Sequence, residues 1–297
     1  MRSHDGGFAG EMPPPPPKHT MPPPLGRIPA GMTKSGAKPV AVWNAAVPIS
    51  QRTPTSALST LAGTTRMSPM YAPVLILTKG LDPATGQRLS TCVRGRAVAV
   101  LSGPNMAEEI AEGLPTAAVV ASEDGFLAGQ LQHALSSTLF RAYVNPDVVG
   151  VELCAAAKNV IGLAAGGVDG LRLGDNAKAA VITRGLAEMA RLGEAAGARP
   201  ETFAGLAGMG DLVVTCWSRH GRNRHAGELI AQGLTPAQAM AEIGQTVEGL
   251  TTAPVLRDLS HRLGVELPIT EGVCAVLSGQ NLTDLVSRLM GREPTEE

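Results

Sequence analysis

The sequence predicts an α/β domain followed by an all-helical domain, behind a Pro-rich N-terminal segment. Short apolar runs alternate with helical patterns between residues 73 and 146, which is typical of an α/β sheet. From residue 147 onward the strand-like runs stop, and apolar residues recur at helical spacing. Residues 1–72 show neither the alternation of a strand nor the apolar spacing of a helix. The chain therefore divides into three parts of different character.

The first part, residues 1–72, is of low complexity. Up to and including Pro73, the chain holds 14 of its 23 prolines and only two acids, Asp5 and Glu11. Such a composition buries too little apolar surface to offset chain entropy. We therefore expect residues 1–72 to be disordered or an out-of-frame translation. Residues 73–146 then form the α/β domain and residues 147–297 the helical domain.

Four strands are predicted in the α/β domain. PVLILTKG gives a strand at 74–77 that runs into a loop carrying Lys79, and AVAVLSGP gives a second strand that Gly103 and Pro104 stop. The segments 116–122 and 140–144 supply the third and fourth. Helices are expected between them, in MAEEIAEGL at 106–114 and from an N-cap at Ser122 to about Leu135.

Helices account for the remainder of the chain. The segment 175–197 repeats apolar residues at i, i+3 and i+4, with Asp175 as the expected cap and Gly197 as the stop. The segments 199–208, 235–244 and 251–264 continue this pattern. The sequence therefore predicts an all-α domain after residue 147.

Composition excludes several classes of protein. The four cysteines lie far apart, which favours a reduced, cytoplasmic chain. We find no apolar run that approaches the ~18 residues of a membrane span. The six histidines lack metal-ligand spacing, so no metal site is predicted. The basic excess lies in the Pro-rich segment without interleaved aromatics, which argues against nucleic-acid binding.

Lys158 stands out because it interrupts the apolar stretch VELCAAAKNVIGLAAGG, with Asn159 directly after it. A buried lysine has a lowered pKa and can exchange a proton near neutral pH. The alternative is a lysine whose stem packs on apolar neighbours while its ammonium reaches solvent. Residue type alone favours this second interpretation.

A Gly-rich segment at 205–227 changes that balance. It holds Asp211 at the start of an apolar run, followed by Arg222 and Asn223. Glycines let backbone amides approach a ligand, and an Arg fork binds phosphate oxygens. A solvated surface and an anion site are equally compatible with these arginines. An acid and a phosphate-binding group nearby favour Lys158 as a proton donor.

Taken together, these segments resemble the NAD(P)-dependent glycerol-3-phosphate dehydrogenase family in its bacterial form. The resemblance runs from about Pro73 to about Leu277 and includes TKG at 78–80, LSGPNMAEEIAEGLPTA at 101–117, KNVIGLAAGGVDGLRLGDNAKAAVITRGLAEM at 158–189, GMGDLVVTC at 208–216, RNR at 222–224 and VEG at 247–249. It implies a Rossmann domain, partial in this chain, and a helical domain that binds substrate. The implied reaction interconverts sn-glycerol 3-phosphate and dihydroxyacetone phosphate with NAD(P)⁺ and NAD(P)H, which supplies glycerol 3-phosphate for phospholipid synthesis.

The resemblance also implies roles for single residues. Lys158 matches the general acid/base. The positions that match substrate contacts are Lys79, Gly103, Asn105, Lys158, Asn159, Asp211, Gly221, Arg222 and Asn223. Those that match cofactor contacts are Lys79, Ala107, Arg222, Thr246 and Glu248. The resemblance further implies a homodimer formed through the helical domain.

This sequence departs from the family in two places. Gly221 stands where a Ser is common, which removes a hydroxyl donor. No G-x-G-x-x-G turn occurs before Lys79, although that turn should present a helix N-terminus to the pyrophosphate. The first half of the Rossmann domain, which sets the preference for NAD or NADP, is therefore missing or unreadable.

Two alternatives to a glycerol-3-phosphate dehydrogenase remain open. The chain could be a remnant that binds a sugar phosphate or dimerises without hydride chemistry. It could also be a related reductase of β-hydroxyacids or ketopantoate with the same two-domain plan. The RNR segment beside a Gly-rich turn favours a phosphorylated substrate over the second alternative.

Overall fold

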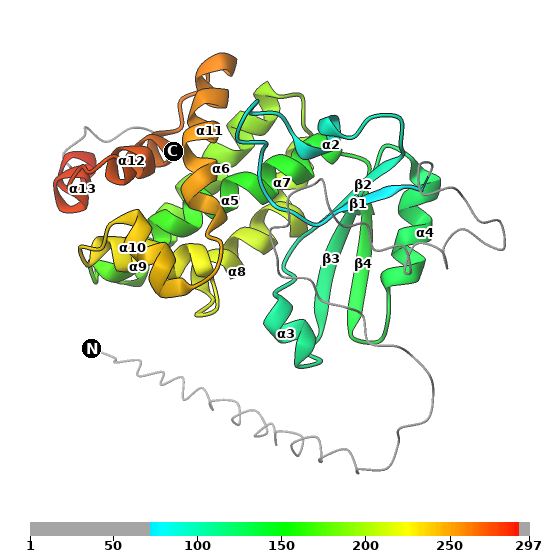
Figure 1. The fold of residues 1–297 in the computed structure, drawn as a ribbon, viewed down its shortest axis with the longest axis horizontal. Helices are drawn as coiled ribbons and strands as arrows, with labels where there is room; N and C mark the ends of the chain where they lie inside the picture. Colours follow the sequence, from blue (N-terminus) through cyan, green and yellow to red (C-terminus); the bar gives the residue numbers. More distant parts are fainter. Residues whose placement is uncertain (1–71, 291–297) are drawn as a thin grey trace, which may run out of the picture. The chain divides into compact units, whose positions relative to one another are not determined.

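The computed structural model describes residues 72–290, with side chains described up to residue 286 (Figure 1). Apart from its last residue, the Pro-rich segment predicted at 1–72 lies outside the described residues. Within them, a small sheet is followed by a run of helices. An α/β part followed by an all-α part was predicted, and the structure confirms this order.

The four predicted strands are present, but they form a mixed sheet. They are β1 (Val74–Ile76), β2 (Val98–Ser102), β3 (Thr116–Ala121) and β4 (Phe140–Asn145), and they lie side by side in chain order. β1 pairs with β2 and β3 with β4 in parallel, whereas β2 and β3 are antiparallel. The sheet therefore departs from the all-parallel arrangement of a Rossmann half.

One face of the sheet is covered by α4 (Gly125–Leu135), as Figure 1 shows. Leu127, Ala128 and Leu131 of this helix are buried against apolar strand residues. Our prediction of Ser122 as the N-cap is wrong. Asp124 is the cap, because its carboxylate accepts hydrogen bonds from the amides at positions 126 and 127. Ser122 instead donates its hydroxyl to the carbonyl of Val98 (2.7 Å).

The opposite face of the sheet is covered by the start of α5 (Val148–Gly170). Val148 and Val151 share one buried cluster with Val100 and Val119 of the strands. The boundary predicted between residues 146 and 147 therefore lies directly before a helix whose first turn packs against strands β2 and β3. Two shorter helices, α2 (Leu89–Cys92) and α3 (Ala107–Ala111), lie between the strands in sequence.

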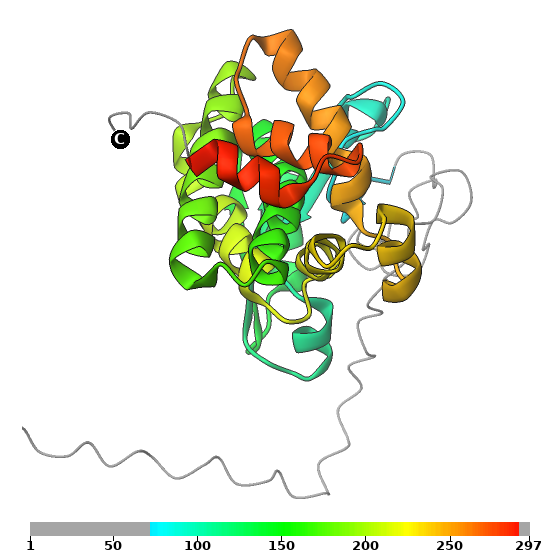
Figure 2. The same cartoon turned by 90° about the vertical axis from the view of Figure 1, so that its left-hand side faces the viewer.

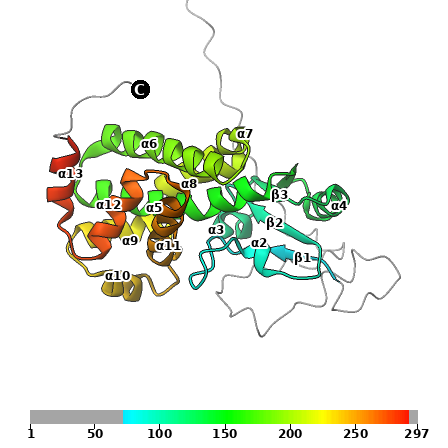
Figure 3. The same cartoon turned by 90° about the horizontal axis from the view of Figure 1, so that it is seen from above.

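α5 is the central helix of the all-α part. Figure 3 shows it running from the sheet into the helices, with α6 (Gly174–Ala195) along one side. The other helices are α7 (Pro200–Ala204), the π-helical turn η1 (Leu206–Gly210), α8 (Asp211–Trp217), α9 (Arg222–Ala231), α10 (Pro236–Ile243), α11 (Glu248–Leu263), α12 (Pro268–Leu277) and α13 (Leu282–Met290). Figure 2 shows the same helices from the side of α13.

By length and hydropathy α5 could cross a membrane, so our expectation that no apolar run reaches that size is wrong. However, 89% of its most apolar window is buried inside the structure, as in a core helix. Its buried Glu152 accepts hydrogen bonds from Arg88 and from the amide and hydroxyl of Ser90. The apolar character of α5 therefore reflects burial by protein on nearly every side.

Our prediction for the start of α6 is wrong, and our prediction for its end is correct. Asp175 does not cap this helix. The N-cap is Leu173, and Asp175 lies in the first turn, near the positive end of the helix. Gly197 follows the C-cap with a φ of +82°, a conformation that glycine adopts without strain.

α5 and α9 approach each other closely through glycines. A Cβ added at Gly166 would lie 1.8 Å from the carbonyl oxygen of Arg224, and one at Gly227 would lie 2.0 Å from that of Leu163. Side chains at these positions would force the two backbones apart. The glycines therefore fix the position of α9, which carries Arg222 and Asn223.

We expect Gly166→Ala to lower the free energy of unfolding by about 3 kcal/mol or more, because the added methyl overlaps backbone. Gly129→Ala is the matched control, since a Cβ at this position in α4 meets nothing within 4 Å. It should raise stability by up to about 1 kcal/mol. Urea denaturation measures both. Equal stability of the two variants would contradict the close helix contact.

Candidate active site

Lys158 is buried in the middle of α5, where its ammonium faces α8. The residue is 5% exposed. Its Nζ donates to Asp211 Oδ1 (2.5 Å) and to Thr215 Oγ1 (2.9 Å). Asp211 and Thr215 lie one turn apart on α8, so both side chains lie on the same face of that helix. Residue type alone favoured an ammonium that reaches solvent, and that interpretation is wrong, because the side chain is buried.

Burial and neighbouring charges set the ionisation of this pair. Burial lowers the pKa of Lys158 to about 8, although the negative charge of Asp211 opposes this effect. Burial would raise the pKa of Asp211, but the charges of Lys158 and Lys79 outweigh it and hold that pKa below its usual value. A lysine with a pKa of about 8 can both donate and accept a proton near neutral pH.

Lys79 reaches the same carboxylate from the loop after β1. Its Nζ donates to Asp211 Oδ2 (3.0 Å), to Asn105 Oδ1 (2.8 Å) and to the carbonyl of Gly103 (3.1 Å). Gly103 has a φ of +106°, and a Cβ there would lie 3.3 Å from the Cα of Ala118. The turn after β2 therefore requires glycine.

Asn159 connects this cluster to α9 and α11. Its Nδ2 donates to Glu248 Oε2 (3.1 Å) and to the carbonyl of Lys79 (3.3 Å). Its Oδ1 accepts from Asn223 Nδ2 (2.9 Å), and Asn223 Oδ1 accepts from the amide of Gly249 (2.8 Å). Both ends of the Asn223 amide are thereby fixed.

The remaining predicted residues lie around this network. Arg222 donates to the carbonyl of Thr246 (2.9 Å). Gly221 is the N-cap of α9, and no side chain caps that helix. A Cβ at Gly221 would lie 2.9 Å from the carbonyl oxygen of Thr215, so a side chain would be crowded there. Ala107 begins α3, two residues after Asn105.

Sequence reasoning missed Thr215, which accepts a hydrogen bond from the catalytic candidate Lys158. Its spacing of four residues from Asp211 in GDLVVTC could have revealed it, because such residues share one face of a helix.

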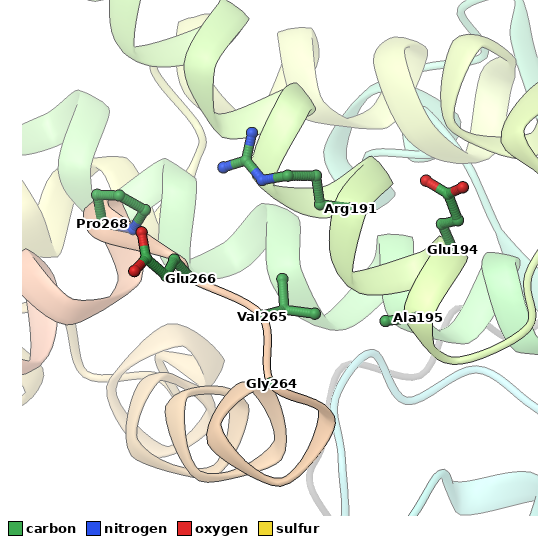
Figure 4. Close-up of a pocket in the computed structure, with 7 residues that line it drawn as sticks. All are labelled: Arg191, Glu194, Ala195, Gly264, Val265, Glu266 and Pro268. Atoms are coloured by element: carbon green, nitrogen blue, oxygen red, sulfur yellow. The ribbon is translucent and has the colours of Figure 1, made fainter.

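A cavity of about 480 Å³ lies away from this cluster, between α6 and the loop that joins α11 to α12 (Figure 4). It is lined by Arg191, Glu194, Ala195, Gly264, Val265, Glu266 and Pro268. None of these residues is buried, and no hydrogen bond between their side chains organises the cavity. The convergence of two lysines on one buried carboxylate identifies the candidate active site better than this hollow does.

Some of the described residues suit a nicotinamide dinucleotide. The guanidinium of Arg222 suits a pyrophosphate, and the carboxylate of Glu248 suits a hydroxyl or carboxamide donor. No G-x-G-x-x-G turn occurs in residues 72–290. Within the same range, no three His, Cys, Asp or Glu side chains are grouped to hold a metal. Arg222 and Glu248 thus offer groups that complement such a cofactor.

Comparison with known proteins gives consistent matches. The sequence model for the NAD-dependent glycerol-3-phosphate dehydrogenase C-terminus matches residues 147–286, and that for the N-terminus matches residues 41–128. The second match begins upstream of residue 73, where we place the start of the α/β domain.

Individual relatives agree with these matches. The glycerol-3-phosphate dehydrogenase [NAD(P)+] of Symbiobacterium thermophilum is 52% identical over 76% of this chain and 68% of its own length. The enzyme of the same name from a Synechococcus strain is 48% identical over 77% of this chain and 74% of its own length. The crystal structure of the Coxiella burnetii glycerol-3-phosphate dehydrogenase superposes with a TM-score of 0.72 at 39% identity, over 74% of this chain and 69% of that one.

We expect Asp211→Asn to lower the pKa of Lys158 below about 8, because it removes the negative charge that stabilises the ammonium. NMR titration of the labelled lysine side chains measures this shift. Asp258→Asn is the matched control, since Asp258 is an exposed carboxylate paired with Arg257. An unchanged or higher pKa in Asp211→Asn would show that Asp211 is not the counterion.

Proposed function

The chain belongs to the NAD(P)-dependent glycerol-3-phosphate dehydrogenase family, and on this premise we propose how it interconverts sn-glycerol 3-phosphate and dihydroxyacetone phosphate. One observation carries the assignment of the site. The buried ammonium of Lys158 pairs with the carboxylate of Asp211, and that carboxylate also binds Lys79 from the loop after β1. This arrangement supports a proton donor at the junction of the α/β part and the helical part.

Lys158 acts as the general acid in ketone reduction. Its ammonium donates a proton to the carbonyl oxygen of dihydroxyacetone phosphate, and the neutral amine takes the proton back when the alcohol is oxidised. Its low exposure strengthens this transfer, because little water competes for the proton. Asp211 keeps the ammonium charged and oriented, and Thr215 accepts a second hydrogen bond from it.

The substrate is bound by groups on both parts of the chain. Lys79, Gly103 and Asn105 form the wall contributed by the sheet, and Asn159 lies opposite on α5. Arg222 and Asn223, at the start of α9, bind the phosphate group. An Arg fork with an amide donor is suited to phosphate oxygens, and the fixed amide of Asn223 presents its donor in one orientation.

Bound NADH or NADPH supplies the hydride. The residues that would hold this cofactor are Lys79, Ala107, Arg222, Thr246 and Glu248. Because Lys79 and Arg222 also serve the substrate, the two binding sites adjoin. The glycerol 3-phosphate formed is a precursor for phospholipid synthesis. We also propose that the chain is cytoplasmic and that it forms a homodimer through the helical domain. Light scattering on the purified chain measures its molar mass and so tests for the dimer.

The activity is tested by oxidation of NADPH or NADH that depends on dihydroxyacetone phosphate. We expect turnover by the full chain and a loss of roughly 10²–10⁴-fold in Lys158→Ala, the range for removal of a general acid. Binding of glycerol 3-phosphate without any turnover would instead support a remnant that only binds a sugar phosphate. Turnover of a β-hydroxyacid or ketopantoate with none of the phosphate ester would reassign the substrate.

The pH dependence follows from the pKa of Lys158, which is about 8. Ketone reduction needs the protonated lysine, so kcat/KM for dihydroxyacetone phosphate should be level below about pH 8 and fall above it. Alcohol oxidation needs the neutral amine and should rise up to the same pH. Steady-state kinetics in both directions measure these profiles. A reduction profile that rises through about pH 8 would exclude Lys158 as the acid.

A further inference from the structure

A charged cluster beside the proposed phosphate site is not used by the mechanism above. It comprises Asp169 near the end of α5, Lys178 on α6, and Arg224 and Glu228 on α9. Lys178 Nζ lies 2.5 Å from Asp169 Oδ1, and Arg224 NH1 lies 2.7 Å from Asp169 Oδ2. Arg224 also pairs with Glu228 (3.3 Å). We call these four residues the Asp169 cluster.

The charges of the Asp169 cluster are mutually satisfied. Two cations face two carboxylates, so no net positive charge is left for an anionic ligand. The ammonium of Lys178 also lies 5.0 Å from the ring centroid of Trp217, the last residue of α8. Lys178 is buried. The arrangement therefore suits a role in fixing neighbouring backbone better than a role in binding an anion.

The cluster holds the loop that leads into the phosphate-binding residues. Arg224 Nε donates to the carbonyl of Ser218 (3.1 Å), which also accepts from the amide of Gly221 (3.1 Å). The hydroxyl of Ser218 accepts from the amide of His220 (3.2 Å). Residues 218–221 thus form a compact turn that Arg224 closes from outside, directly before Arg222 and Asn223.

Asp169 determines where the Arg224 guanidinium lies. The NH1 atom of Arg224 lies closer to the carboxylate of Asp169 than to that of Glu228, and the Glu228 side chain is the more exposed of the two. With NH1 held by Asp169, the Nε–H of the same planar group points at the Ser218 carbonyl. The Asp169 carboxylate, itself held by Lys178, therefore fixes the 218–221 turn through one rigid guanidinium.

We propose, building on the proposed function, that Asp169 is a positioning residue that aligns Arg222 and Asn223 with the substrate phosphate through Arg224 and the 218–221 turn. The hydrogen bonds of Lys158, Lys79 and Asp211 involve no member of the Asp169 cluster. Loss of Asp169 should therefore weaken recognition of the phosphate and leave proton transfer intact.

The test compares two ketones in the full chain, dihydroxyacetone phosphate and dihydroxyacetone. Asp169→Asn keeps the shape of the side chain and removes its charge. We expect kcat/KM for the phosphate ester to fall about 10- to 100-fold, mostly through KM, because a small displacement of a binding group is costly. For dihydroxyacetone the change should be less than about twofold, since that substrate has no phosphate. Asp258→Asn, an exposed carboxylate-to-amide change, should affect neither substrate.

Arg224→Lys is the second variant and carries the test if Asp169→Asn does not fold. It keeps the positive charge but has no Nε–H for the Ser218 carbonyl, so it should show the same selective loss. Asp169→Glu restores the charge and should recover part of kcat/KM for the phosphate ester. Equal losses with both ketones in a folded variant, or no loss with either, would overturn the proposal.

Isothermal titration calorimetry distinguishes failure of this proposal from failure of the proposed function. If the wild-type chain reduces neither ketone, the proposed function fails, and binding of sn-glycerol 3-phosphate decides the role of Asp169. Wild-type binding that weakens about tenfold or more in Asp169→Asn, with glycerol as the comparison ligand, supports the positioning role. Unchanged affinity, or no binding by the wild type, overturns it.

Discussion

Burial of the Lys158 ammonium constrains the rest of the structure. An ammonium inside an apolar helix bundle needs a carboxylate, and loss of one partner of such a buried pair costs about 3–5 kcal/mol. Asp211 meets that need because α8 begins at that residue and presents its first turn to α5. The position of α8 relative to α5 is therefore tied to the charge of a single side chain.

The same carboxylate joins the sheet to the helices. Each of its two oxygens binds one lysine, Lys158 from α5 and Lys79 from the loop after β1. Asn159 adds a second connection through the carbonyl of Lys79. Glu152 of α5 adds a third connection, further from the site. It accepts hydrogen bonds from Arg88 and Ser90, which follow the loop of Lys79 in the sequence. α5 thus holds the loop of Lys79 by polar contacts at several positions.

Close approach of backbones is the second constraint. α9 lies so near α5 that glycine is required on both helices, at Gly166 and Gly227. This contact brings Asn223 within hydrogen-bond distance of Asn159. The phosphate-binding residues therefore depend on small residues inside helices, where glycine otherwise lowers stability. These glycines lower the stability of α5 and α9 as separate helices, but they allow the close contact that the site requires.

The sequence by itself determined the order of strands and helices, because the change from short apolar runs to helical spacing is local. It also singled out the segments that carry Lys158, Asp211 and Arg222. It did not determine that Asp124 caps α4, since Ser122 has an equally suitable side chain. Only the tertiary structure decided that the hydroxyl of Ser122 faces a strand carbonyl. Likewise, only packing decided that Lys158 is buried and bound to Asp211 and Thr215. These partners lie 53 and 57 positions further along the chain, so both contacts depend on how α5 and α8 meet.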